Sequence, residues 1–169
     1  MSRHLYLLRH GEADHEGAPT WTHDSRRPLT RQGKEKMALQ AAAMQRTGLE
    51  VEAIVTSPYL RARQTAEIVA AAYRMEDRLV ESDLLEPGAS FNDLQKTLRT
   101  VSAARVLVVG HAPDLGEWAG ELTGSDPIAL GKGWLAWIRL EGEMENGGGR
   151  LKALFPAEWM QSVGRLLAG

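Results

Sequence analysis

The chain has 169 residues, of which 43% are apolar and 25% are charged, and its formal net charge at pH 7 is −2. This length and composition are typical of one globular domain, which we predict over residues 1–169, and the charge argues against a large basic face for nucleic acid. The sequence contains no cysteine, which excludes disulfides, thiolate nucleophiles and thiolate metal sites. No apolar run reaches the roughly 18 residues of a membrane span, and no signal peptide is visible, so we expect a cytoplasmic protein with no membrane partner.

The predicted strands and helices alternate along the chain. Strands are predicted at residues 4–9, 52–57, 79–81 and 105–110, with a terminal hairpin at 134–140 and 151–155. Helices are predicted at residues 30–47 and as segments beginning at Pro58, Ser90, Pro113 and Pro156. This order predicts an α/β protein, a three-layer α/β/α sandwich with a mostly parallel sheet and a C-terminal hairpin.

Polar side chains follow three of the predicted strands at the point where each strand ends. Arg9 and His10 end the first strand, Arg61 lies in the first turn of the helix after the second, and His111 follows the strand at 105–110. Because ligands bind at the carboxyl ends of strands in open parallel sheets, we expect these side chains to meet at one edge. A buried cation needs a partner, so two arginines and a helix N-terminus at this edge favour a bound anion.

Three segments carry a resemblance to a known family. They read LLRHGEA at residues 7–13, VTSPYLRARQTA at 55–66 and VLVVGHAPDL at 106–115. In this order they resemble the signatures of the histidine phosphatase superfamily, which has a phosphoglycerate-mutase-like fold. The short length, together with RPLTRQGKEK at 27–36 and LLEPGAS at 84–90, is most similar to the small SixA-type phosphohistidine phosphatases of that superfamily.

The resemblance implies a role for each matching residue. His10 matches the nucleophile that accepts the phosphoryl group, and Arg9, Arg61 and His111 match the phosphate-binding side chains. Glu86 lies near the position of the general acid in the mutase-like branch. No metal or cofactor is implied.

Two further points concern the residues around this set. Gly11 lacks a side chain, so we expect it to leave room for a phosphate beside the backbone. Glu12 and Asp14 stay open as alternative proton donors to Glu86, and Trp21 is a candidate contact at the pocket mouth.

The predicted function is hydrolysis of a phosphomonoester or phosphoramidate through a phosphohistidine intermediate on His10. The expected substrate is a phosphorylated protein, with phosphohistidine favoured, or a small phosphorylated molecule. The segment LLEPGASFNDL at 84–94 leaves little chain for a lid, which disfavours mutase chemistry because a mutase must shield its intermediate from water.

Three alternatives stay open at this stage. One is a phosphatase of broad small-molecule specificity, and another is a non-catalytic module that binds a phosphorylated ligand and could dispense with His10. A metal hydrolase could use His4, His15 and His23, but no metal-ligand spacing such as H-E-x-x-H occurs.

Overall fold

A six-stranded mixed sheet forms the centre of the molecule in the computed structural model, which describes residues 2–15 and 21–169. The order across the sheet is β3-β2-β4-β1-β5-β6. The strands are β1 (Arg3–Arg9), β2 (Ala53–Thr56), β3 (Leu79–Glu81), β4 (Arg105–Gly110), β5 (Leu135–Leu140) and β6 (Gly149–Phe155). The pairings among β1 to β4 are parallel, whereas β5 pairs antiparallel with β1 on one side and with β6 on the other. The pair β5 and β6 forms the hairpin at the end of the sheet.

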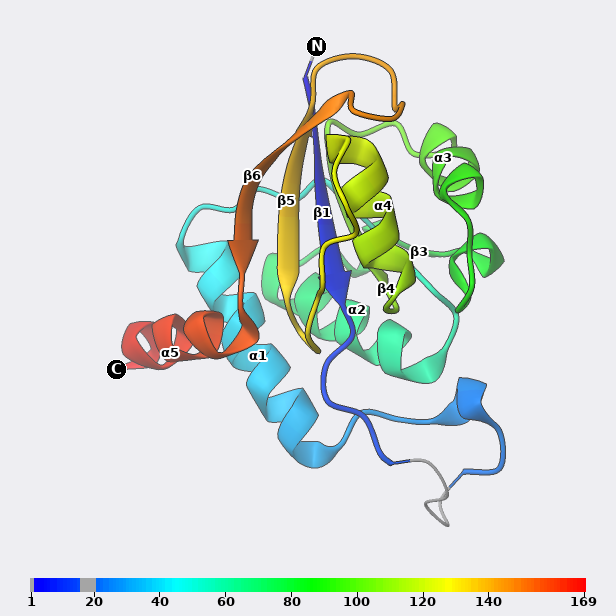
Figure 1. The fold of residues 1–169 in the computed structure, drawn as a ribbon. Helices are drawn as coiled ribbons and strands as arrows, with labels where there is room; N and C mark the ends of the chain where they lie inside the picture. The colour runs from blue at the N-terminus through cyan, green and yellow to red at the C-terminus, as the bar shows by residue number, and fades with distance from the viewer. Residues whose placement is uncertain (1, 16–20) are drawn as a thin grey trace.

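Helices cover both faces of the sheet, which confirms the predicted three layers (Figure 1). The helices are α1 (Arg31–Arg46), α2 (Leu60–Tyr73), α3 (Phe91–Arg99), α4 (Asp114–Thr123) and α5 (Ala157–Ala168). One apolar core lies between the sheet and α3 and α4, and the other lies between the sheet and α1, α2 and α5. No helix in the described part of the chain is long and apolar enough to cross a membrane.

Strand β1 shows why the first strand reads as one continuous apolar run. Successive side chains of a strand point to opposite faces, so Leu5 and Leu7 enter the core of α3 and α4 while Tyr6 and Leu8 enter the other core. Because β4 and β5 flank β1, the residues that follow Arg9 emerge in the middle of the sheet edge.

The helix starts follow the predicted capping residues in all but one case. Thr30 caps α1 by accepting the Gly33 N–H at 2.8 Å, and Ser90 forms a capping box with Asp93 at the start of α3. The prediction that Pro58 begins a helix is wrong by two residues. Tyr59 is still extended and α2 begins at Leu60, because the backbone first turns through a hydrogen bond from Tyr59 N–H to the Ser57 hydroxyl at 3.2 Å.

The N-terminus of α1 packs directly on the segment that follows β1. A Cβ atom on Gly33 would lie 2.1 Å from the carbonyl oxygen of Glu12, so only glycine allows this approach. The Glu12 carbonyl also accepts the Thr30 N–H at 3.0 Å. Helix α1 thereby fixes the position of the backbone at Glu12, in the segment that follows β1.

Candidate functional site

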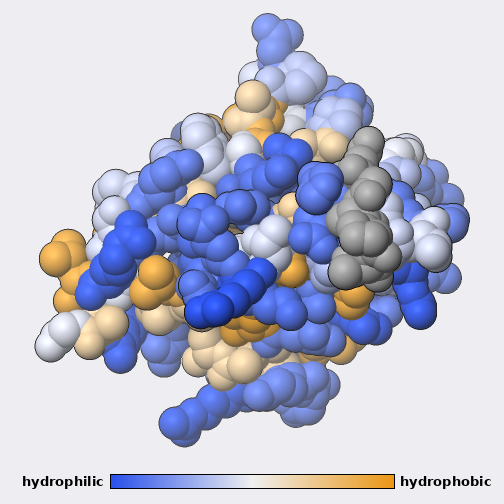
Figure 2. All heavy atoms as spheres, turned by 90° about the horizontal axis from the view of Figure 1, so that it is seen from below, coloured by the Kyte–Doolittle hydropathy of each residue, from blue (hydrophilic) through white to orange (hydrophobic). Residues whose placement is uncertain are grey.

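Four of the predicted site residues meet at the carboxyl edge of the sheet. Arg9 is the last residue of β1, His10 follows it, His111 follows β4, and Arg61 lies in the first turn of α2. Each of His10, Arg61 and His111 is at most 5% exposed. We call these four residues the cationic cup. Seen from this edge, the surface around it is predominantly hydrophilic (Figure 2).

Hydrogen bonds fix the tautomer of His10. Its Nδ1 lies 2.7 Å from the carbonyl oxygen of Gly11, which can only accept, so the ring carries its proton on Nδ1. The lone pair on Nε2 then accepts the Nε–H of Arg61 at 3.3 Å. Burial lowers the pKa of His10 to about 3, and the neighbouring charges of Arg61 and Arg9 act in the same direction. His10 is therefore a neutral imidazole at pH 7 whose unprotonated Nε2 accepts from the Arg61 guanidinium.

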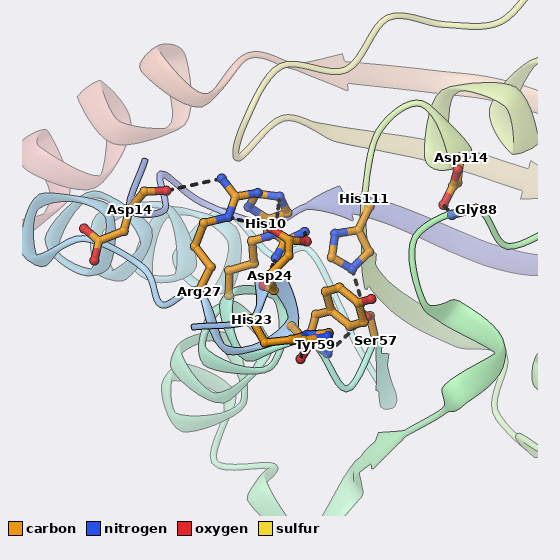
Figure 3. Close-up of polar contacts among 12 residues, drawn as sticks. His10, Asp14, His23, Asp24, Arg27, Ser57, Tyr59, Gly88, His111 and Asp114 are labelled. Carbon is orange, nitrogen blue, oxygen red and sulfur yellow. Dashed lines mark hydrogen bonds and ion pairs between the residues drawn. The ribbon is translucent and has the colours of Figure 1, made fainter. Parts of the chain in front are cut away.

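His111 is held by the serine that ends β2. Its Nε2 lies 2.8 Å from the hydroxyl oxygen of Ser57, which already accepts the Tyr59 N–H (Figure 3). The Ser57 hydroxyl keeps its O–H to donate and one lone pair to accept, so this contact is compatible with the His111 proton on Nδ1 or on Nε2. Nδ1 is buried and has no hydrogen-bond partner in the described part of the chain.

The two imidazole rings of the cup lie side by side. Their centroids are 5.4 Å apart. Burial lowers the pKa of His111 to about 3, with the charge of Arg61 as the next cause. His111 is neutral as well, and in the tautomer with the proton on Nδ1 it presents an uncharged donor to an incoming acceptor.

Arg61 is engaged on two sides. Its Nη1 donates to the backbone carbonyl of Asp24 at 2.9 Å and its Nη2 to the Asp24 carboxylate at 3.1 Å, while Nε faces His10. Asp24 belongs to a short 3₁₀ helix, Asp24–Arg26, in the loop that joins β1 to α1. The Asp24 carboxylate also pairs with Arg27 at 3.1 Å, and Arg27 lies over the ring of Trp21 at 5.9 Å.

Arg9 supplies the second guanidinium of the cup. Its Nη1 donates to the carbonyl of Leu130 at 2.9 Å, and its Nε is buried with no partner among residues 2–15 and 21–169. Burial and the charge of Arg61 both lower the pKa of Arg9, although a guanidinium stays protonated in proteins. Arg9 and Arg61 are two neighbouring cations, and no carboxylate among the described residues pairs with Arg9. The cup is therefore suited to an anion.

Gly11 is bonded to α2 and packed against α1. Its N–H donates to the Thr65 hydroxyl at 3.1 Å, and a Cβ atom would lie 3.4 Å from Met37 and 3.5 Å from Leu29. A Cβ atom at this position would therefore make only ordinary van der Waals contacts, so packing alone does not require glycine here. The contact of Gly11 with a phosphate stays a prediction.

The structure does not join Glu86 to the cup by any bond. Its exposed side chain makes no hydrogen bond or ion pair with described residues, and it lies in the loop after the 3₁₀ helix Asp83–Leu85. Buried Asp114 anchors that loop by accepting the Gly88 N–H at 2.8 Å (Figure 3). Glu12, the alternative donor, is bonded to Lys36 at 2.8 Å.

Sequence reasoning missed Asp24 and Ser57, which bond residues of the cup, and Asp114, which anchors the loop of Glu86. The position of Ser57 at the end of β2 was a usable signal, because the same edge argument that selected Arg9 and His111 applies to it. Asp24 lies in an aperiodic polar loop, so no pattern in the sequence relates it to Arg61. Asp114 follows His111 by one helical turn but bonds a loop from another part of the chain.

The histidines considered for a metal site lie apart. His4 accepts the indole N–H of Trp137 at 2.9 Å, and His23 bonds Ser25 at 2.9 Å. Among the described residues no three His, Cys, Asp or Glu side chains are grouped so that they could hold a metal ion.

Comparison with known proteins places this geometry in a family. The model of the histidine phosphatase superfamily, branch 1, matches residues 5–95, which is more than half of the chain. The chain belongs to the histidine phosphatase superfamily. It is therefore a phosphatase, and the sequence-based assignment to this superfamily is confirmed.

The relatives of this histidine phosphatase include small phosphohistidine phosphatases. It is 30% identical to the phosphohistidine phosphatase SixA of Escherichia coli over 149 residues, which cover 86% of this chain and 88% of the relative. A structure of the protein histidine phosphatase SixA complexed with tungstate matches with a TM-score of 0.79 and 28% identity, over 91% of this chain and 97% of that one. A phosphoserine phosphatase of Entamoeba histolytica, at 13% identity and a TM-score of 0.68 over 93% and 98% of the two chains, shares the fold.

Proposed function

We propose that this phosphatase hydrolyses the phosphoramidate bond of protein phosphohistidine through a phosphohistidine intermediate on His10. The observation that carries the proposal is the state of His10: a neutral ring whose Nδ1–H is bonded to Gly11 and whose unprotonated Nε2 accepts from Arg61. A nucleophilic nitrogen beside a guanidinium suits attack on a bound phosphoryl group. The names of the SixA relatives support phosphohistidine as the substrate class.

In the first step the Nε2 lone pair of His10 attacks phosphorus in line with the leaving group. The P–Nε2 bond forms while the bond from phosphorus to the substrate nitrogen breaks, and the leaving imidazole takes a proton from solvent water. Arg9 and Arg61 stabilise the charge that spreads over the equatorial oxygens, and the Nδ1–H of His111 adds a neutral donor. In the second step water attacks phosphorus and gives up one proton to solvent while the P–Nε2 bond breaks, which releases phosphate and restores the Nε2 lone pair.

The leaving group sets the requirement for a general acid. An imidazole is expelled more easily than an alkyl alkoxide, so a phosphoramidate needs less proton donation than an alkyl phosphate. We propose Glu86 as the donor for oxygen leaving groups, because it is an unpaired carboxyl group in the loop that Asp114 anchors beside the His111 segment. Phosphohistidine would then be turned over with little help from Glu86.

Trapping of the intermediate tests the proposed function. Rapid mixing with a ³²P-labelled phosphohistidine peptide followed by quenching should leave acid-labile, alkali-stable label on the wild-type protein. His10→Ala should carry no label and turn over no substrate but still bind phosphate, since Arg9, Arg61 and His111 remain. Near-normal turnover by His10→Ala would contradict the assignment of the nucleophile.

The same preparation separates the remaining alternatives. A non-catalytic module would bind the phosphorylated peptide without becoming labelled, and a metal hydrolase would lose activity in excess chelator, where we expect full activity. We further propose that residues 1–169 act as one domain with a phosphorylated protein as partner. A cytoplasmic location, without nucleic acid or membrane partners, stays a prediction.

A further inference from the structure

A polar pocket of about 490 Å³ lies next to the cationic cup. It is formed where the start of α1, the start of α5 and the segment before β5 come together (Figure 1). Its lining includes Gly11, Lys36, Gln40, Lys132, Trp134 and Gln161. A volume of this size is in the range of ligand sites, and the mechanism described above does not use it.

The pocket and the cup share a wall. The N–H of Gly133 lies 3.1 and 3.0 Å from the carbonyl oxygens of Arg9 and His10, and the carbonyl of Leu130 accepts from the Arg9 guanidinium at 2.9 Å. The segment 130–134 is thus bonded to the cup residues while Trp134 lines the pocket. Gly11, which lines the pocket, directly follows His10 in the chain, so the pocket adjoins the position of a phosphoryl group at His10.

The buried part of the pocket offers amide-like hydrogen-bonding groups. Gln40, which is 1% exposed, is fixed by donating to the Gly133 carbonyl at 2.7 Å, and Gln161, 8% exposed, donates to the Gln40 side chain at 3.4 Å. The amide oxygen of Gln161 and the indole N–H of Trp134 make no hydrogen bond with any described residue. One acceptor and one donor are available, which matches a ligand that carries both kinds of group.

The charges of the pocket disfavour a free anion. Lys36 is paired with Glu12 at 2.8 Å, and the other two charged residues of the lining, Lys132 and Glu158, are exposed and of opposite sign. An apolar ligand would leave the glutamine and indole groups without partners, which costs free energy. A neutral ligand with amide groups fits best.

We propose that this pocket binds the main chain of the polypeptide segment that flanks the phosphorylated side chain of a substrate protein. The inference rests on the proposed function, which supplies a phosphorylated protein as substrate. The Gln161 amide oxygen accepts a main-chain N–H of that segment, and the Trp134 indole N–H donates to a main-chain carbonyl. Lys132 and Glu158 pair with charged side chains of the segment at the pocket rim.

Kinetics with substrates of different length test this inference. The substrates are a ten-residue peptide with a central phosphohistidine, the free phosphohistidine amino acid, and p-nitrophenyl phosphate. The variants Trp134→Phe and Gln161→Met each remove one hydrogen-bonding group and keep most of the side-chain volume. We expect each to raise KM for the peptide about three- to tenfold, as for a lost hydrogen bond, and to leave kcat/KM for the two small substrates within about twofold.

A control variant and a control substrate separate the pocket from general effects on folding, and Lys132→Gln tests the pocket rim. Trp137→Phe removes an indole N–H in β5, three residues after Trp134 but outside the pocket, so it should not change KM for the peptide. Lys132→Gln alters only an exposed side chain and should raise KM for peptides with an acidic flank. An unchanged kcat/KM for p-nitrophenyl phosphate in the same preparations would show that the cationic cup is intact.

Three outcomes would overturn the inference. The first is an equal change in kcat/KM for all three substrates, and the second is a wild-type KM that does not depend on peptide length. The third is a pocket variant that raises KM for an added sugar phosphate and leaves KM for the peptide unchanged, since a sugar would then be the occupant. A wild-type protein that hydrolyses p-nitrophenyl phosphate but neither form of phosphohistidine would instead contradict the proposed function.

Discussion

The Asp24 carboxylate and the Arg61 guanidinium form an ion pair of 3.1 Å at the rim of the cup. Asp24 accepts from both terminal nitrogens of the guanidinium, Nη1 through its carbonyl oxygen and Nη2 through its carboxylate. The edge of the guanidinium that carries Nε therefore faces His10. A guanidinium binds an oxyanion well only when its N–H groups are directed at the oxygens, so Asp24 in the loop determines the orientation of Arg61 on α2.

We expect Asp24→Ala to lower kcat/KM about ten- to hundredfold, because Arg61 then loses the carboxylate that orients it. Asp24→Asn keeps an accepting oxygen and should retain more activity than Asp24→Ala. Steady-state kinetics with phosphohistidine peptide and phosphate inhibition measure both variants. Asp126→Asn, an equal charge change after the end of α4, is the control. Tighter phosphate binding by Asp24→Ala would show instead that the carboxylate competes with the ligand.

The two buried histidines make stability depend on pH. Burial lowers the pKa of both His10 and His111 to about 3, whereas the unfolded chain has values near 6.5. Below about pH 6.5 the unfolded state binds more protons, so the free energy of unfolding should fall as the pH falls, by up to about 1.4 kcal/mol per pH unit for each histidine. This contribution is fully present above pH 6.5 and is lost toward pH 3.

Urea unfolding between pH 7.5 and pH 5 in phosphate-free buffer measures this dependence. His10→Gln should show a shallower decline than the wild type, because one of the two buried titrating groups is gone. An unchanged slope in His10→Gln would contradict the depressed pKa of that ring.

Gly33→Ala, a change in the first turn of α1 and outside the cationic cup, should lower both stability and turnover. The added Cβ atom would come within 2.1 Å of the Glu12 carbonyl oxygen, so α1 and the segment after His10 must move apart. Overpacking of this kind costs about 1–3 kcal/mol of stability. We expect a lower melting temperature and reduced turnover. Gly142→Ala is the matched control, because a Cβ atom there meets nothing within 4 Å. Equal behaviour of the two variants would refute the tight approach.

Glu86→Gln tests the proposed proton donor. The variant should slow hydrolysis of alkyl phosphates strongly, by about 10²- to 10⁴-fold as for loss of a general acid, and phosphohistidine peptide only slightly. Side-by-side kcat values on the two substrate classes measure the difference, with Glu76→Gln as an exposed control outside the site. Equal slowing of both classes would exclude Glu86 as an acid that depends on the leaving group.

Several features of this protein could be predicted from local sequence. The apolar run of β1 predicts a strand buried on both faces, and Thr30 and Ser90 predict helix starts through their caps. Since parallel strands end at one edge, the order of the strands was enough to expect Arg9, His10, Arg61 and His111 together. Local signals sufficed because periodicity and capping involve neighbours only a few residues apart.

Other features were decided only by the tertiary structure. The tautomer of His10 depends on the Gly11 carbonyl, the His111 ring is held by Ser57, and the orientation of Arg61 depends on Asp24, 37 residues away in the chain. The depressed pKa of both histidines comes from burial, which no local pattern encodes. The sequence by itself therefore determined the fold and the set of side chains that meet at the edge of the sheet. The tertiary structure decided their protonation and orientation, because these depend on hydrogen bonds and desolvation supplied by distant segments.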